Sequence, residues 1–84
     1  MRNNRLIASA VWLDTPTFAG WVGRVSGWIN GDAISSYVGG NPNPNAAGLF
    51  PAINAAELYA DAIRRERGAL SARIVCRLPK GMSR

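Results

Sequence analysis

Histidine is absent from the 84-residue sequence, and cysteine occurs once, as Cys76. Without a histidine or a second cysteine, one chain cannot build a zinc site of the usual Cys/His type or a Ser/His or Cys/His catalytic pair. Acidic residues are also few, at five. Glu57 and Asp61 are spaced to share one face of a helix, but this spacing is typical of ion pairs with the arginines that follow. We therefore expect no enzyme activity, no metal and no cofactor.

The sequence also lacks long apolar runs. The longest, Leu6 to Leu13, falls far short of the roughly 20 residues that a transmembrane helix needs. The basic start followed by this apolar run imitates a signal peptide, but the small residues Ala8-Ser9-Ala10 lie inside the run rather than after it. A lone cysteine forms no internal disulfide. These features predict a cytoplasmic protein that does not associate with membranes.

The composition that remains is that of a small folded protein. Hydrophobic residues make up 48% of the chain and charged residues 18%, which is typical of globular proteins and not of disordered ones. A chain of this length supplies enough apolar material for one core. We expect residues 1–84 to form a single small domain.

Basic residues outnumber acidic residues, and the formal net charge is +5. The excess is concentrated near the C-terminus, because residues 64–84 contain seven bases and one acid whereas residues 1–63 contain three bases and four acids. The seven bases are Arg64, Arg65, Arg67, Arg73, Arg77, Lys80 and Arg84. This segregation of charge favours an anionic partner.

The Asn30-Gly31 pair lies between two runs that contain apolar residues. Both residue types tolerate positive φ, which a type I′ turn needs at both central positions. We predict a hairpin that pairs residues 18–29 with residues 32–38, with Ile29 opposite Asp32. The predicted core face carries Trp21, Val25, Ile29, Ile34 and Val38, with Gly23 and Gly27 leaving room for close packing. The predicted outer face carries Val22, Arg24, Ser26, Trp28, Ala33, Ser35 and Tyr37.

Apolar residues recur at helical spacing after Pro51, which predicts an amphipathic helix over residues 55–67. We expect its residues Leu58, Tyr59 and Ile63 to lie over the core face of the hairpin.

Both ends of this helix carry recognisable signals. Asn54 is expected to cap the first turn, with Glu57 returning the bond and Ile53 packing on Leu58. Arginines crowd the last turn, where the helix dipole favours cations, and Gly68 is expected to end the helix.

Two further segments show the alternation of a strand. From Ser71 to Leu78, apolar residues alternate with Ser71, Arg73 and Arg77, and Cys76 falls on the apolar side, where we expect it to be buried. Residues 5–13 fit a strand or a helix, and we prefer a strand. Residues 39–51, rich in Pro, Asn and Gly, are expected to form a long loop.

The elements follow the order β-β-β-α-β. We predict an α+β fold in which a three- or four-stranded, mainly antiparallel sheet packs on one amphipathic helix.

Two functions from different classes fit these features. If the last strand joins the sheet, its arginines emerge on the same outer face as Arg24, Trp28 and Tyr37. Such interleaving of cations and aromatics favours binding of nucleic acid, especially of a single strand or an irregular RNA. The predicted binding residues are Arg24, Trp28, Tyr37, Arg73 and Arg77, helped by Arg64, Arg65, Arg67 and Lys80. The alternative is a protein-binding module, such as a small, possibly phage-encoded inhibitor or a subunit of an assembly, because tryptophan and arginine also anchor protein interfaces.

Overall fold

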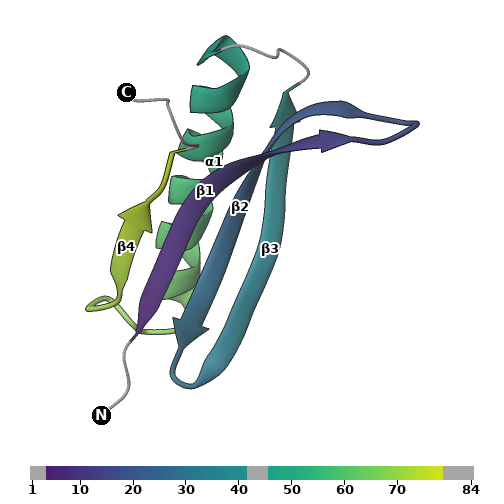
Figure 1. Ribbon diagram of the computed structural model, residues 1–84. Helices are drawn as coiled ribbons and strands as arrows, with labels where there is room; N and C mark the ends of the chain where they lie inside the picture. The colour runs from purple at the N-terminus through teal and green to yellow at the C-terminus, as the bar shows by residue number, and fades with distance from the viewer. Residues whose placement is uncertain (1–3, 42–45, 79–84) are drawn as a thin grey trace.

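A computed structural model describes residues 4–41 and 46–78 of the chain (Figure 1). Its elements are β1 (Arg5–Asp14), β2 (Ala19–Ile29), β3 (Asp32–Asn41), α1 (Ala46–Glu66) and β4 (Arg73–Cys76). The strands form one four-stranded sheet in the order β3-β2-β1-β4. The first three strands are antiparallel, β4 runs parallel to β1, and α1 lies across one face. The predicted α+β fold is confirmed.

The turn between β2 and β3 has the predicted geometry. Asn30 has a φ of 51° and Gly31 a φ of 87°, the positive values of a type I′ turn. Ile29 is opposite Asp32, and the predicted register continues along the hairpin. The predicted core face is also confirmed, because Val25 and Ile29 are fully buried and Ile34 nearly so.

The base of a long β1–β2 arm is held by aromatic contacts. The rings of Trp12 and Trp21 meet edge to face, with centroids 5.6 Å apart and an interplanar angle of 78°. Phe18 lies over Gly40, where an added Cβ would meet its ring at 3.2 Å. The pairing of β3 with β2 shifts register between Trp21 and Gly23, and Gly39 near this shift has a φ of 65°. The arm therefore covers the C-terminal end of β3.

The helix is longer than predicted. It begins at Ala46, so Asn54 lies inside it, and the prediction that Asn54 caps the first turn of the helix is wrong. Pro51 lies within the helix and removes one backbone hydrogen bond there, at a cost of about 3 kcal/mol. Leu49 and Ile53 are fully buried against the sheet, and burial of about 1.5–3 kcal/mol each offsets that cost.

This longer helix also corrects the predicted loop. Residues 39–41 belong to β3 and residues 46–51 to α1, while residues 42–45 lie outside the described part of the chain. A sequence reading that treats Pro as a helix boundary places the helix start too late.

The buried stripe of α1 differs in part from the predicted one. It consists of Leu49, Ala52, Ile53, Ala56, Ala60 and Ile63. Ile63 is on this stripe as predicted, but Leu58 is 73% exposed and does not lie over the hairpin. Tyr59 lies at the margin, beside β3. The stripe is set by small alanines, which let the helix backbone approach the sheet, rather than by the larger Leu58.

The closest approach occurs at Gly23 of β2. A Cβ added at Gly23 would lie 2.5 Å from the carbonyl oxygen of Ala52 and 3.0 Å from that of Val38. Only glycine therefore allows α1 to pack at this depth without a shift of backbone.

The C-terminal end of α1 follows the prediction. Gly68 has a φ of 67°. Its N–H donates to the carbonyl of Arg65 at 3.1 Å, and the N–H of Ala69 donates to that of Arg64 at 2.8 Å. This is the paired bonding of a Schellman motif, which satisfies the last carbonyls of the helix.

The final strand is shorter than predicted, and one of its residues is misassigned. Residues 5–13 form a strand as preferred, and β4 pairs with it from Arg73 to Cys76. Cys76 is exposed rather than buried, with its sulfur 3.8 Å from a carboxylate oxygen of Glu57. The alternation correctly puts Cys76 on the helix side, but β4 is an edge strand that α1 only partly covers.

Replacing Gly23 by alanine tests the close approach of α1. We expect Gly23→Ala to lower the free energy of unfolding by about 1–3 kcal/mol, because the methyl group forces backbone apart. Urea unfolding measures this effect, with Ser9→Ala, a change on the opposite face of the sheet, as the control. Equal stability of the two variants would contradict it.

The buried face of α1, which differs in part from the predicted one, gives a second test. Ile53→Ala should cost about 2–5 kcal/mol because it leaves a cavity, whereas Leu58→Ala should stay within about 0.5 kcal/mol. Thermal unfolding of both variants distinguishes them. A larger loss of stability for Leu58→Ala would mean that the face of α1 predicted from the sequence is the buried one.

Candidate functional site

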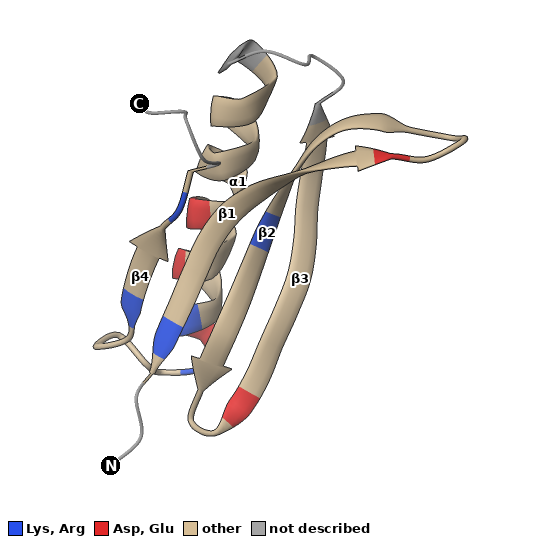
Figure 2. Cartoon of the chain, in the orientation of Figure 1, with Lys and Arg blue, Asp and Glu red and all other residues tan. Residues whose placement is uncertain are grey.

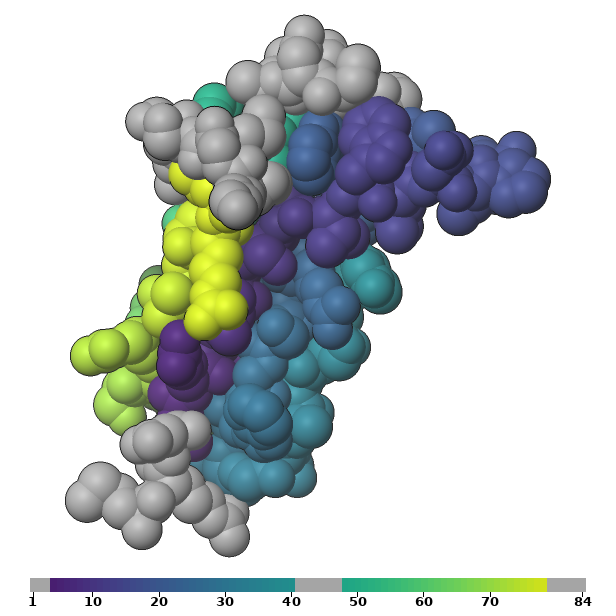
Figure 3. Space-filling view, in the orientation of Figure 1, coloured from purple at the N-terminus to yellow at the C-terminus, as the bar shows by residue number. Residues whose placement is uncertain are grey.

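One face of the sheet is covered by α1, and no other described element covers the opposite face (Figures 1 and 3). We call this opposite face the outer face. Strand alternation and the pairing registers place on it Arg5, Ile7, Ser9 and Val11 of β1; Val22, Arg24, Ser26 and Trp28 of β2; Ala33, Ser35 and Tyr37 of β3; and Arg73 and Val75 of β4.

Two aromatic side chains project from the outer face. Trp28 is 59% exposed and Tyr37 is 56% exposed. Trp28 lies opposite Arg5 on β1 and opposite Ala33 on β3. Tyr37 is four residues beyond Ala33, which separates the two aromatics by roughly 14 Å along the strands. Each ring therefore offers a separate surface for stacking.

Tyr37 is held by a neighbouring arginine. Arg24 is directly opposite Tyr37, and its guanidinium carbon lies 5.5 Å from the centroid of the ring. One guanidinium nitrogen of Arg24 also donates to Ser35 Oγ at 3.4 Å. A cation over the ring face is attracted by the ring quadrupole, so this contact limits the motion of both side chains.

Arg5 and Arg73 form a second cationic feature. They are directly opposite each other in the pairing of β1 with β4. Like charges in this position repel, and among the described residues neither arginine forms an ion pair with an acid. A bound anion would relieve this repulsion. The sequence analysis did not select Arg5, although its place just before the alternating Leu6 and Ala8 already put it on the outer side.

Arg77 continues this line of cations. Its N–H donates to the carbonyl of Ala8 at 2.8 Å, so it extends the pairing of β4 with β1 by one step. The alternation of Arg73 and Val75 then places Arg77 on the outer face, where it is exposed.

The helix arginines belong to a different surface. Arg64 and Arg65 both pair with Asp61, at 2.5 and 2.8 Å, as the sequence predicted. Arg67 pairs with Asp32 at 3.3 Å. The predicted site is therefore divided: Arg24, Trp28, Tyr37, Arg73 and Arg77 share the outer face, whereas these three arginines do not. Lys80 lies outside the described residues.

The ion pairs also change the acid. The hydrogen bond from Arg64, aided by the nearby charge of Arg65, holds the pKa of Asp61 below its usual value. Charge is thus largely balanced within the helix layer.

The outer face, in contrast, carries cations alone. Figure 2 marks the charged positions along the chain. Strand alternation puts Asp14 and Asp32 on the other side of their strands, so among the residues that the structure describes the outer face has four arginines and no acid. The charge segregation between the two layers differs from the one along the sequence, because Arg5 and Arg24 of the outer face come from residues 1–63 and Arg73 and Arg77 from residues 64–84.

The described residues show no cluster of metal-binding side chains. No group of three or more His, Cys, Asp or Glu residues comes together among them. Within the same part of the chain, no helix is long and apolar enough to cross a membrane. Comparisons with family models, curated proteins and solved structures found no significant match.

The ion pairs of Asp61 predict a specific dependence of stability on pH. A folded-state pKa below the usual 3.8 means that Asp61 stabilises the fold above that pH and that this contribution is lost as pH falls through the lowered value. Asp61→Asn should therefore be less stable than the wild type at about pH 7 and equally stable at about pH 2. Urea unfolding at both pH values measures this. An equal difference in stability between Asp61→Asn and the wild type at both pH values would contradict this prediction.

Proposed function

We propose that this chain binds single-stranded nucleic acid on the outer face of its sheet, without catalysing a reaction. The observation that supports the proposal is a combination on the outer face, which no other described element covers: two aromatic rings, each more than half exposed, with four arginines and no acid among the described residues.

The two residue types do different work. Bases stack on exposed tryptophan or tyrosine, and each stacked base contributes about 1–3 kcal/mol. Arginine binds phosphate through a planar fork of N–H donors and also stacks on bases. A pleated sheet holds the backbone positions of both types at fixed spacings, so the protein backbone needs no ordering when a nucleic-acid strand binds.

Each outer-face residue then has a distinct part. Trp28 and Tyr37 provide the stacking surfaces, and Arg24 positions Tyr37. Arg5 and Arg73 contact phosphate, which replaces their mutual repulsion with attraction to an anion.

Single strands fit this face better than duplexes. The flat faces of paired bases are hidden in the stack, so Trp28 and Tyr37 gain contact only where bases are unpaired. The helix arginines contribute less, because Arg64 and Arg65 already neutralise Asp61.

A protein partner is the second candidate for the same face. The feature that favours it is the set of apolar residues Ile7, Val11 and Val75 between the arginines. Exposed tryptophan, tyrosine and arginine are also the residues that dominate protein interfaces. Salt dependence separates the candidates, because only phosphate binding releases condensed counterions.

Fluorescence anisotropy with a labelled single-stranded oligonucleotide over a salt series tests the proposal. If Arg5 and Arg73 each contact one phosphate, the double variant Arg5→Ala/Arg73→Ala should flatten the log-log slope by about 1.4, at 0.7 per phosphate. Trp28→Ala should weaken binding by about 1–3 kcal/mol with little change in slope.

The matched control is Arg64→Ala/Arg65→Ala, which removes the same formal charge from the helix layer and should change the slope much less. Equal flattening by both double variants would move the site away from the outer face. Absence of oligonucleotide binding at low salt would overturn the proposal and leave the protein partner as the candidate. Tighter binding of a duplex of the same length would overturn the preference for single strands.

A further inference from the structure

The sheet ends at β3, and most of this edge is open. β3 is ten residues long. Between Ala33 and Val38 it has no charged residue and no proline, which are the usual devices that keep edge strands from pairing with another chain. Near the C-terminal end of β3, Phe18 lies over Gly40.

The hairpin turn determines which backbone groups this edge presents. Ile29 and Asp32 close a two-residue turn and therefore form a hydrogen-bonded pair. By alternation, residues 34, 36 and 38 also bond to β2, whereas Ala33, Ser35 and Tyr37 direct their N–H and C=O groups away from the sheet. These outward groups match those of another extended strand.

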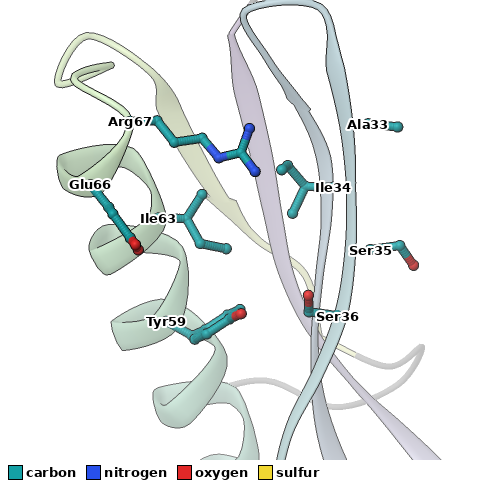
Figure 4. Close-up of a pocket in the computed structure, with 8 residues that line it drawn as sticks. All are labelled: Ala33, Ile34, Ser35, Ser36, Tyr59, Ile63, Glu66 and Arg67. Carbon is teal, nitrogen blue, oxygen red and sulfur yellow. The ribbon is translucent and has the colours of Figure 1, made fainter.

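A groove lies beside the same edge, between β3 and α1 (Figure 4). Its volume is about 490 Å³. Ile34 and Ser36 line it from β3, and Tyr59 and Ile63 line it from α1. Ile34 and Ile63 give the groove an apolar part, Ser35, Ser36 and Glu66 give it a polar part, and Arg67, paired with Asp32, also lines it. A strand added to β3 would direct every second side chain into it.

We propose that β3 pairs with β3 of a second copy of this chain, antiparallel, about a twofold axis at Ser35. Pairing is limited by the turn before Asp32 and by the irregular backbone at Gly39. The open stretch between these limits, residues 32–38, has Ser35 at its centre. Ala33 and Tyr37 then lie opposite Tyr37 and Ala33 of the second copy, and each pair exchanges two hydrogen bonds.

The side chains are complementary in this register. On the outer face, each large Tyr37 meets a small Ala33. On the helix side, Ile34 of the second copy lies next to Ser36 and enters the groove, where Ile34 and Ile63 offer apolar contacts. The other edge is a poorer candidate, because β4 is four residues long and self-pairing would bring together the cations Arg73 and Arg77.

The pairing would extend the candidate nucleic-acid site. The twofold axis is perpendicular to the joined sheet, so both outer faces lie on the same side. Trp28, Ala33 and Tyr37 of the second copy then form one row, which places the two aromatics two strand spacings apart, or about 9.6 Å. Within one chain they are separated by roughly 14 Å. This consequence rests on the proposed function, whereas the dimer itself does not.

Light scattering and sedimentation of the whole chain at up to about 1 mM test the dimer. The expected result is twice the mass of the 9.0 kDa chain. Ser35→Pro removes an outward N–H, which no bond within the sheet uses, and should raise the dissociation constant at least about tenfold. Ser35→Ala keeps the N–H and should leave the dimer intact. Circular dichroism verifies that both variants fold.

Cross-linking tests the register. Opposed residues of a hydrogen-bonded pair have Cα atoms about 5.5 Å apart, within the range of a disulfide. In a Cys76→Ser background, Ser35→Cys should therefore form a disulfide-linked dimer under mild oxidation. Ser26→Cys is the control, because two such residues would lie three strand spacings apart, about 14 Å, and should not cross-link. Equal cross-linking of the two variants would overturn this register.

The two proposals fail separately. A wild type that stays monomeric, with no cross-link through residue 35, overturns the dimer even if the monomer binds oligonucleotide. A dimer that binds no oligonucleotide overturns the proposed function alone. If both proposals hold, Ser35→Pro should weaken oligonucleotide binding and Ser35→Ala should not. Equal binding by the two variants would mean that the row formed by Trp28, Ala33 and Tyr37 of the second copy is not part of the binding site.

Discussion

The type I′ turn at Asn30 and Gly31 determines most of what the sheet presents to its surroundings. Its two positive φ values fix Ile29 opposite Asp32, and a slip of one residue would move every side chain of β3 to the other face. The same register puts Trp28 and Tyr37 outside and Val25 inside. It also decides which backbone groups of β3 bond to β2 and which remain at the open edge. Face and edge are therefore consequences of one local constraint.

The second constraint is the shallow depth of the core. Gly23 and the alanines of α1 let the helix lie close to the sheet, so one helix is enough to bury Leu6, Val25 and Ile29. Such a fold has only two layers, and the other side of the sheet is left exposed. Acids pair with arginines in the helix layer, whereas the outer face has arginines alone among its described charges. Exposure and charge thus coincide on one surface.

Local chemistry explains which features the sequence predicts. The turn, the hairpin register and the glycine that ends α1 each depend on residues adjacent in sequence, and all three are confirmed. The start of the helix is different, because burial of Leu49 and Ile53 outweighs the boundary signal of Pro51. Exposure of Cys76 depends on the position of β4 at the edge of the sheet, where α1 covers it only in part. The proximity of Arg5 to Arg73 requires the parallel pairing of β1 with β4, which no local pattern specifies.

The strand order reconciles a strongly basic face with association of two copies. In the order β3-β2-β1-β4, Arg5 and Arg73 lie on the strands farthest from the proposed axis. Across the joined sheet, Arg5 of one copy would be five strand spacings from Arg5 of the other, about 24 Å. That separation exceeds the Debye length of about 8 Å at physiological ionic strength, so their repulsion is largely screened. The uncharged stretch of β3, residues 33–38, therefore forms the centre of the joined sheet, and the cations lie on both sides of it, where a bound nucleic-acid strand would cross them.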